Sequence, residues 1–137
     1  MGVIRDLPAD QIEALLHEAT VYRIACAHPD SDRPYLVPIA LAYDGVALYG
    51  HTGPGTKLRA MRANPHVAIE VDHATASDTW ESVVADGTYE ELTNPDAAAA
   101  ALRLIYPEPN PLPDLGVNTV IFRIDLSNKT GRYERPA

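Results

Sequence analysis

The sequence has little cysteine and no long apolar run, and both shortages narrow what the protein can be. Its 137 residues include one cysteine, Cys26, which excludes an internal disulfide and favours a reducing compartment. Cys26 lies in a β-rich apolar run, so we expect a buried strand thiol. No segment approaches the roughly 20 apolar residues of a membrane helix, and the N-terminus lacks the apolar stretch of a secretory signal. We therefore expect a cytoplasmic protein with no membrane partner, folded as a single domain over residues 1–137.

Basic residues are also scarce, but they are unevenly distributed. The sequence has eleven Lys and Arg and nineteen Asp and Glu, which gives a net charge of −8. This charge argues against nucleic-acid binding, because that binding needs a basic surface. No acidic residue lies between Gly45 and Ile69, although this segment holds His51, Lys57, Arg59, Arg62 and His66. A positive segment in an acidic protein predicts an anion site. The alternative is chance clustering of charge on a solvated helix.

Six β-rich segments separated by turn residues predict a mainly β fold. The expected strands are 20–27, 33–43, 46–51, 66–72, 80–92 and 118–126, and short helices are expected at 8–19, 57–63 and 94–106. Asp44-Gly45 predicts a hairpin turn, Gly87 a bulge, and Pro38 an edge or a bulge. Residues 127–137 read as a polar tail. Tight hairpins with helical insertions favour a six-stranded antiparallel barrel over a doubly wound sheet.

The strongest local motif is the loop from His51 to Lys57, which reads His-Thr-Gly-Pro-Gly-Thr-Lys. Gly53 and Gly55 let the backbone approach a ligand closely, and a helix capped by Thr56 would present unpaired N–H groups with the positive end of its dipole. Lys57 adds a full charge in the first turn. Helix N-termini with these features bind phosphate. A nucleotide P-loop is disfavoured, because the hydroxyl residue that should follow the lysine is Leu58.

Other site chemistries have weaker support. The candidate metal ligands His51, His66, Asp72 and His73 lack the spacing of a known metal motif. Ser82 lacks the nucleophile elbow of a hydrolase. Trp80 has two readings that stay open, packing in a core or dimer interface and stacking on a planar ring.

Several motifs in a fixed order give the chain a family resemblance. They are Arg33-Pro34-Tyr35-Leu36-Val37-Pro38, Tyr43-Asp44-Gly45, Leu48-Tyr49-Gly50-His51-Thr52, Gly55-Thr56-Lys57-Leu58, Asn64-Pro65-His66-Val67, and Trp80-Glu81-Ser82-Val83-Val84 followed by Gly87 and Glu90-Glu91-Leu92. Over residues 20–124 the sequence resembles the pyridoxamine 5′-phosphate oxidase-like FMN-binding split barrels, and within them the nitroimidazole-resistance-type branch.

The resemblance implies a homodimer with two cofactor sites at the subunit interface. By motif, the backbone of Val37, Pro38 and Ile39 would lie along the isoalloxazine ring. His51 and Thr52 would begin the phosphate loop, which Gly55 and Thr56 continue, and Lys57 would grip the phosphate. The neighbouring strand would line the site with Trp80, Ser82 and Val83.

The function implied is that of an FMN-dependent oxidoreductase acting on a small oxidised substrate, for which a nitro compound is one candidate. Three alternatives stay open: a deazaflavin-dependent reductase, a non-catalytic flavin or haem binding module, and a structural dimer without a ligand. Oxidation of pyridoxamine 5′-phosphate itself is not expected, because the extra Arg and Lys residues and the C-terminal segment of the longer oxidases have no counterpart here. The sequence identifies no catalytic residue.

Overall fold

The computed structural model describes residues 2–108 and 114–137, which form three helices and eight strands. In chain order they are β1 (Gly2–Asp6), α1 (Ala9–Glu18), β2 (Val21–Ala27), β3 (Pro34–Ala40), β4 (Ala42–Tyr43), β5 (Ala47–Thr52), α2 (Thr56–Ala63), β6 (His66–Ala76), β7 (Thr79–Glu91), α3 (Pro95–Ile105) and β8 (Val120–Pro136).

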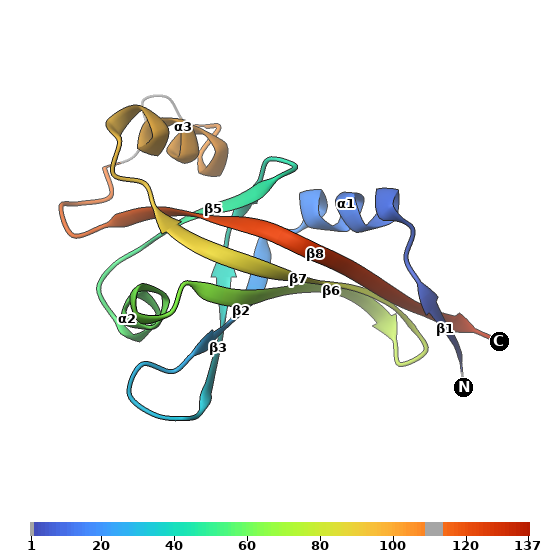
Figure 1. The fold of residues 1–137 in the computed structure, drawn as a ribbon. Coiled ribbons are helices and arrows are strands. Elements are labelled where there is room, and N and C mark those ends of the chain that lie inside the picture. The colour runs from blue at the N-terminus through green and yellow to red at the C-terminus, as the bar shows by residue number, and fades with distance from the viewer. Residues whose placement is uncertain (1, 109–113) are drawn as a thin grey trace.

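All strand pairs are antiparallel and belong to one sheet in the order β3-β2-β6-β7-β8-β5-β4, with β1 paired to β8. Figure 1 shows β7 and β8 side by side across the whole molecule. The two ends of the strand order, β3 and β4, are separated in the chain only by Leu41. The sheet therefore curls until its edges are joined by the chain, not by strand pairing. This open sheet confirms the mainly β, antiparallel split barrel.

Alternating side chains build the core. On β6 Val67, Ile69 and Val71 are buried while the residues between them are more exposed, as the period of two in a strand requires. The largest fully buried side chains are Tyr22, Phe122, Leu16, Ile24, Leu48, Met61, Ile69, Ile124 and Val83. Cys26 is buried as well, which confirms the predicted strand thiol.

The prediction of six strands was wrong in three places. The polar residues after Leu126 continue β8 to Pro136, and β1 pairs with this extension. The expected strand 33–43 is two strands, β3 and β4. The extension was missed because most of its side chains are polar and exposed or half-buried, so it lacks the alternating apolar pattern that predicts a strand.

The predicted bulge at Gly87 was also wrong. Gly87 keeps regular register with Val67 and Leu126. The irregularity lies across the sheet on β8, where Asn128 and Lys129 oppose the single residue Ala85 and Asn128 has φ of +50°. Gly87 is instead a point of close packing, since a Cβ there would lie 2.5 Å from Ile124 Cγ2.

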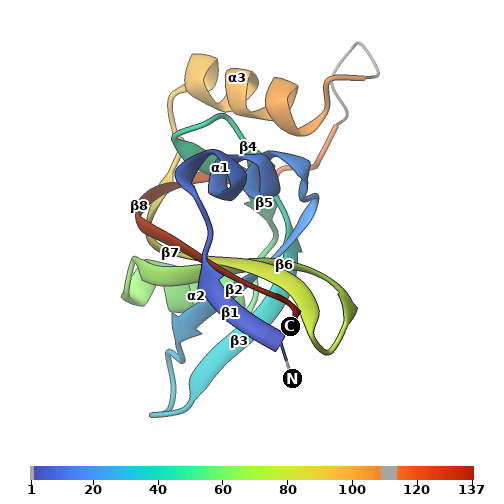
Figure 2. The same cartoon turned by 90° about the vertical axis from the view of Figure 1, so that its right-hand side faces the viewer.

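The edge prediction at Pro38 is confirmed, because β3 ends the strand order. The Asp44-Gly45 turn is confirmed too, with Gly45 at φ of +99° and Asp44 Oδ1 accepting hydrogen bonds from the N–H groups of Val46 and Ala47. Figure 2 places α1 and α3 on the same side of the molecule and α2 on the opposite side. No helix in the described part is long and apolar enough to span a bilayer.

Candidate functional site

The loop between β5 and α2 has open space beside its glycines. A Cβ added at Gly53 or Gly55 would meet no atom within 4 Å, so a ligand can approach the backbone there. The helix begins at Thr56 as its first residue, and the cap is Gly55, without a side-chain hydrogen bond. The prediction of Thr56 as the cap was therefore wrong by one position. Arg59 N–H is the first to bond back, to Gly55 O at 3.1 Å, and the first-turn N–H groups before it have no partner inside the helix.

Lys57 is a half-buried cation for which the described residues supply no carboxylate. Seven of the eleven Lys and Arg side chains form ion pairs, and the unpaired Arg5 and Arg33 lie exposed. Burial lowers the pKa of Lys57, and the nearby Cys26 thiol opposes this shift without reversing it. A partly desolvated charge without an internal counter-charge is a favourable place for an anion to bind.

The other basic residues of the positive segment are neutralised by acids from distant parts of the chain. Arg59 pairs with Asp30 of the β2–β3 loop at 2.8 Å, and Arg62 pairs with Glu91 at the end of β7 at 2.5 Å. The acid-free stretch of sequence therefore overstated the positive charge in space. What is left at the start of α2 is one ammonium group.

His51 forms a hydrogen bond with a residue that no sequence motif connects to it. Its Nε2 lies 2.7 Å from the hydroxyl of Tyr106, at the C-terminal end of α3. Burial lowers the pKa of His51, and the charge of Lys57 lowers it further. Near neutral pH the imidazole is therefore held uncharged between an ammonium and a phenol. No local motif could have revealed the pair, because the two residues are 55 positions apart.

The β3 residues assigned to the ring of the cofactor divide between the two faces of that strand. Ile39 is buried, Val37 is half-buried and Pro38 is exposed. Since β3 is an edge strand, one side of its backbone is not paired within the sheet. This placement is compatible with backbone contacts to a ligand, which are the contacts that the resemblance implies.

The β7 residues assigned to the site lie at the other end of the molecule. On β7, Trp80 pairs with Ala74 of β6. Lys57 interacts electrostatically with Cys26 of β2, whose neighbour Ala25 pairs with Ala68 of β6. Ala68 and Ala74 are six residues apart on β6, which corresponds to roughly 20 Å along the strand. Val83 is buried in the core at 1% exposure, so its side chain is not available to a ligand. Within one chain, Trp80 and Ser82 cannot complete a site around Lys57.

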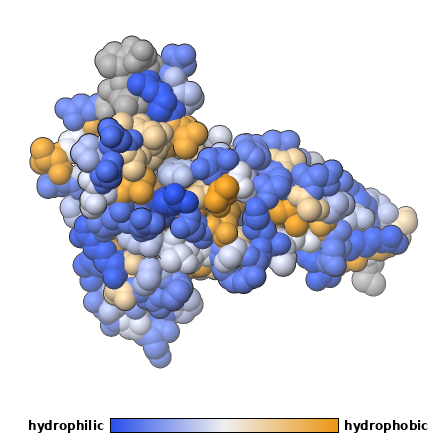
Figure 3. Space-filling model, turned by 45° about the horizontal axis from the view of Figure 1, so that its top comes forward, coloured by the Kyte–Doolittle hydropathy of each residue, from blue (hydrophilic) through white to orange (hydrophobic). Residues whose placement is uncertain are grey.

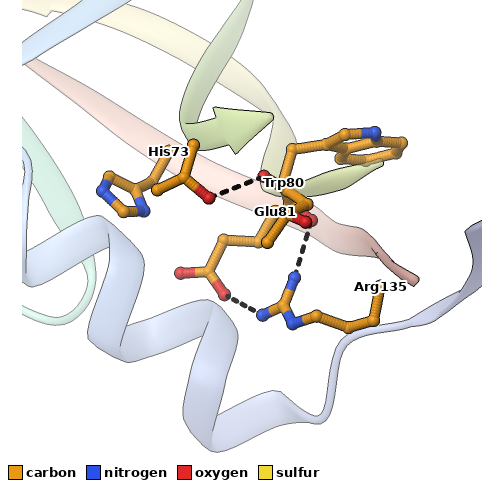
Figure 4. A pocket seen from close by; sticks show the side chains of 6 residues that line it. His73, Trp80, Glu81 and Arg135 are labelled. Atoms are coloured by element: carbon orange, nitrogen blue, oxygen red, sulfur yellow. Dashed lines mark hydrogen bonds and ion pairs between the residues drawn. The ribbon is translucent and has the colours of Figure 1, made fainter. Parts of the chain in front are cut away.

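A cavity of about 220 Å³ lies beside Trp80, at the β6–β7 hairpin. Figure 4 shows Trp80 and Glu81 leaving opposite sides of the strand, with Glu81 turned to Arg135. The Glu81 carboxylate lies 3.5 Å from Arg135, whose guanidinium also donates to Trp80 O at 3.1 Å, and the indole N–H donates to Glu134 at 2.9 Å. The polar groups of Trp80, Glu81, Glu134 and Arg135 therefore have partners within the chain. Within residues 2–108 and 114–137, no three His, Cys, Asp or Glu side chains are grouped so that they could hold a metal.

Comparisons with known proteins bear on the family and the fold. A family model described as pyridoxamine 5′-phosphate oxidase matches residues 8–133. A crystal structure of a FAD-binding protein from Mesorhizobium loti is 35% identical, with a TM-score of 0.76 over 97% of this chain and 99% of that one. A candidate 5-nitroimidazole antibiotic resistance protein from Bacteroides thetaiotaomicron shares the fold at 19% identity, with a TM-score of 0.79 over 96% and 88% of the two chains.

Another relative matches a smaller part of the chain. An uncharacterised protein of Rhizobium meliloti (strain 1021) is 34% identical over 89 residues, which is 65% of this chain and 58% of that protein. The match thus spans little more than half of the relative's length. A FAD-binding protein from Mycobacterium smegmatis, at 22% identity and a TM-score of 0.74 over 96% and 99% of the two chains, adds evidence for the fold.

Proposed function

The chain belongs to the pyridoxamine 5′-phosphate oxidase family, and we propose that it is an FMN-dependent oxidoreductase acting on a small oxidised substrate. The observation that carries the proposal is Lys57, a half-buried ammonium without a carboxylate partner in the described part, beside a glycine loop with open space. A bound flavin supplies the redox chemistry, and the protein supplies binding and polarity. A nitro compound is one candidate for the substrate.

The residues present fit the phosphate end of a flavin. First-turn N–H groups of α2 and the Lys57 ammonium would hold the phosphate, and His51, uncharged and bonded to Tyr106, would close the other side of the loop. The single ammonium group of Lys57 at the start of α2 matches one terminal phosphate, which favours FMN. Two structural relatives are described as FAD-binding proteins and one as an F420 reductase, so FAD and a deazaflavin are the competing cofactors.

We propose further that the site forms between two copies of the chain. Lys57 and Trp80 lie at opposite ends of the sheet in one chain, and a two-fold axis can bring opposite ends of two chains together. In such a homodimer Trp80 and Ser82 of one copy would face the phosphate loop of the other.

Titration with matched flavins tests the cofactor assignment. FMN and riboflavin share the ring and differ in the phosphate, so riboflavin should bind about 10- to 150-fold more weakly, the range for lost charged hydrogen bonds. FAD and F420 are titrated in parallel, and mass spectrometry identifies any chromophore released from the purified protein. If riboflavin binds as tightly as FMN, or no flavin binds, the phosphate role assigned to Lys57 is wrong.

A second measurement separates an enzyme from a flavin-binding module. The flavin-loaded protein is photoreduced without oxygen and mixed with nitro compounds, and reoxidation is followed by absorbance beside free reduced FMN. An oxidoreductase should be reoxidised faster than free FMN by at least one substrate. A rate equal to or below that of free FMN for every compound favours the non-catalytic module.

A further inference from the structure

A larger cavity, of about 460 Å³, lies on the other side of His51. Its walls come from the end of α1, the junction of β3 with β4, and the end of α3. Its size is within the range of pockets that bind small molecules. Figure 3 shows the side of the molecule that carries these helices, where apolar side chains gather in separate patches divided by polar surface.

None of the described residues that line this cavity is Asp, Glu, Lys or Arg. Ala, Leu, Ile, Thr and Pro make most of the wall, and the polar rings are His17, Tyr43, His51 and Tyr106. Burial lowers the pKa of His51, which keeps its imidazole uncharged. An ion entering such a cavity would lose its hydration without a counter-charge, so the wall selects for uncharged molecules.

Tyr43 offers the cavity its ring, not its hydroxyl. The hydroxyl donates to Glu13 at 2.7 Å and accepts from Lys129 at 3.0 Å, and Glu13 and Lys129 also pair with each other. Burial and the hydrogen bond to Glu13 raise the pKa of Tyr43, so the phenol stays protonated. His17 stacks at a tilt on this ring, with centroids 4.7 Å apart. The two rings meet at an angle of 59° and give this part of the cavity an aromatic wall.

Tyr106 has hydrogen-bonding capacity left over. If its hydroxyl donates to His51 Nε2, the phenol oxygen can still accept; if Nε2–H donates to the oxygen, the hydroxyl can still donate. In either tautomer one polar group is available at one end of a mainly apolar cavity. That arrangement orients a ligand by a single hydrogen bond.

We propose that this cavity binds a small, flat, uncharged molecule whose polar group bonds to Tyr106. The identification of that molecule as the substrate rests on the proposed function, since Ala40, Leu41 and Ala42 of the wall directly follow the β3 segment assigned to the flavin ring. Binding itself depends on the cavity alone. Tyr106 is therefore a substrate-binding residue that positions the molecule beside His51.

Three planar probes of similar shape and different charge test the proposal: benzamide, benzoate and benzamidine. Each is titrated into the purified full-length protein at a pH where histidine is neutral, and the imidazole signals of His17 and His51 are followed by NMR. Benzamide should shift both signals to saturation, and the two ions should bind at least about tenfold more weakly because their hydration is lost. The flavin content of each sample is measured separately, so failure of the cavity and failure of flavin binding are distinguishable.

Tyr106→Phe should weaken benzamide about 2- to 12-fold, the range for one neutral hydrogen bond. Tyr49→Phe is the matched control, because this phenol donates to Asp44 outside the cavity, and it should leave the affinity unchanged. The proposal is overturned if no probe shifts the two histidine signals saturably, or if an ion binds as tightly as benzamide. Equal affinities in the Tyr106→Phe and Tyr49→Phe variants would overturn the role of Tyr106.

Discussion

The two ends of the sheet differ in how their polar groups are satisfied. At the β6–β7 hairpin, Trp80, Glu81, Glu134 and Arg135 bond to one another or to the backbone. At the start of α2, Lys57 is half-buried and the described residues provide no carboxylate for it. A fold gains nothing from burying an unpaired charge. The difference supports the proposal that an anion completes the α2 end, whereas these four side chains of the hairpin end already have polar partners within the chain.

The largest expected effect on this difference between the two ends comes from removing the charge of Lys57. Lys57→Met should weaken FMN about 10- to 150-fold, as expected for a lost charged contact, measured by fluorescence titration. Arg59→Met is the matched control: it lies on the same helix but is paired with Asp30, and it should change the affinity little.

Removing the charge of Lys57 should weaken flavin binding but should not destabilise the flavin-free protein. Burial lowers the pKa of Lys57 in the folded protein, so the charged lysine destabilises the flavin-free fold. This penalty is fully present below the folded pKa. It disappears as the pH rises from the folded pKa to the unfolded pKa. Flavin-free Lys57→Met should therefore melt no lower than the wild type. Melting well below the wild type would show that Lys57 is a structural residue.

Mixing two variants tests whether the two ends meet in a dimer. Trp80→Ala should weaken FMN about 2- to 12-fold, the range for an aromatic contact, and Lys57→Met impairs the other half of the site. When both variants are co-refolded, random pairing makes half of the dimers mixed, and each mixed dimer has one intact site. Roughly a quarter of all sites should then regain wild-type affinity.

A site contained in one chain gives a different result. Every chain in the mixture would carry one lesion, so the titration would be the sum of the two parent curves, with no sites of wild-type affinity. Sedimentation of the wild type, run at the same concentrations, establishes whether dimers are present.

The sequence predicted local features well and long-range ones poorly, and the reason is physical. The glycine loop, the Asp44-Gly45 turn and the start of α3 are set by residues within a few positions of each other; Asn94, for example, caps α3 by accepting from Asp96 and Ala97. These are backbone requirements that only certain residues meet.

The missed features depend on the tertiary fold. Asp30 and Glu91 neutralise Arg59 and Arg62 from 29 positions away, and no pattern in a single sequence encodes such pairs. Tyr106 reaches His51 only because α3 packs over β5. The loop with its lysine is a local feature that the sequence could predict, and its role as a site stays a prediction. The neutral cavity was missed, and the separation of Trp80 from Lys57 within one chain was not foreseen.

The smallest expected effect is on the titration of His51, and it tests whether the α2 end works as one electrostatic unit. The charge of Lys57 adds to burial in lowering the pKa of His51, so Lys57→Met should raise that pKa, as followed by NMR of the imidazole ring. A bound phosphate should raise it too, since a negative charge beside Lys57 offsets the ammonium and favours the imidazolium. Inorganic phosphate should therefore raise the pKa of His51 in the wild type and much less in Lys57→Met. Arg59→Met, whose charge is already paired, should behave as the wild type. If phosphate leaves the pKa of His51 unchanged in the wild type, the anion does not bind beside Lys57, and the contrast between the two ends of the sheet has no functional meaning.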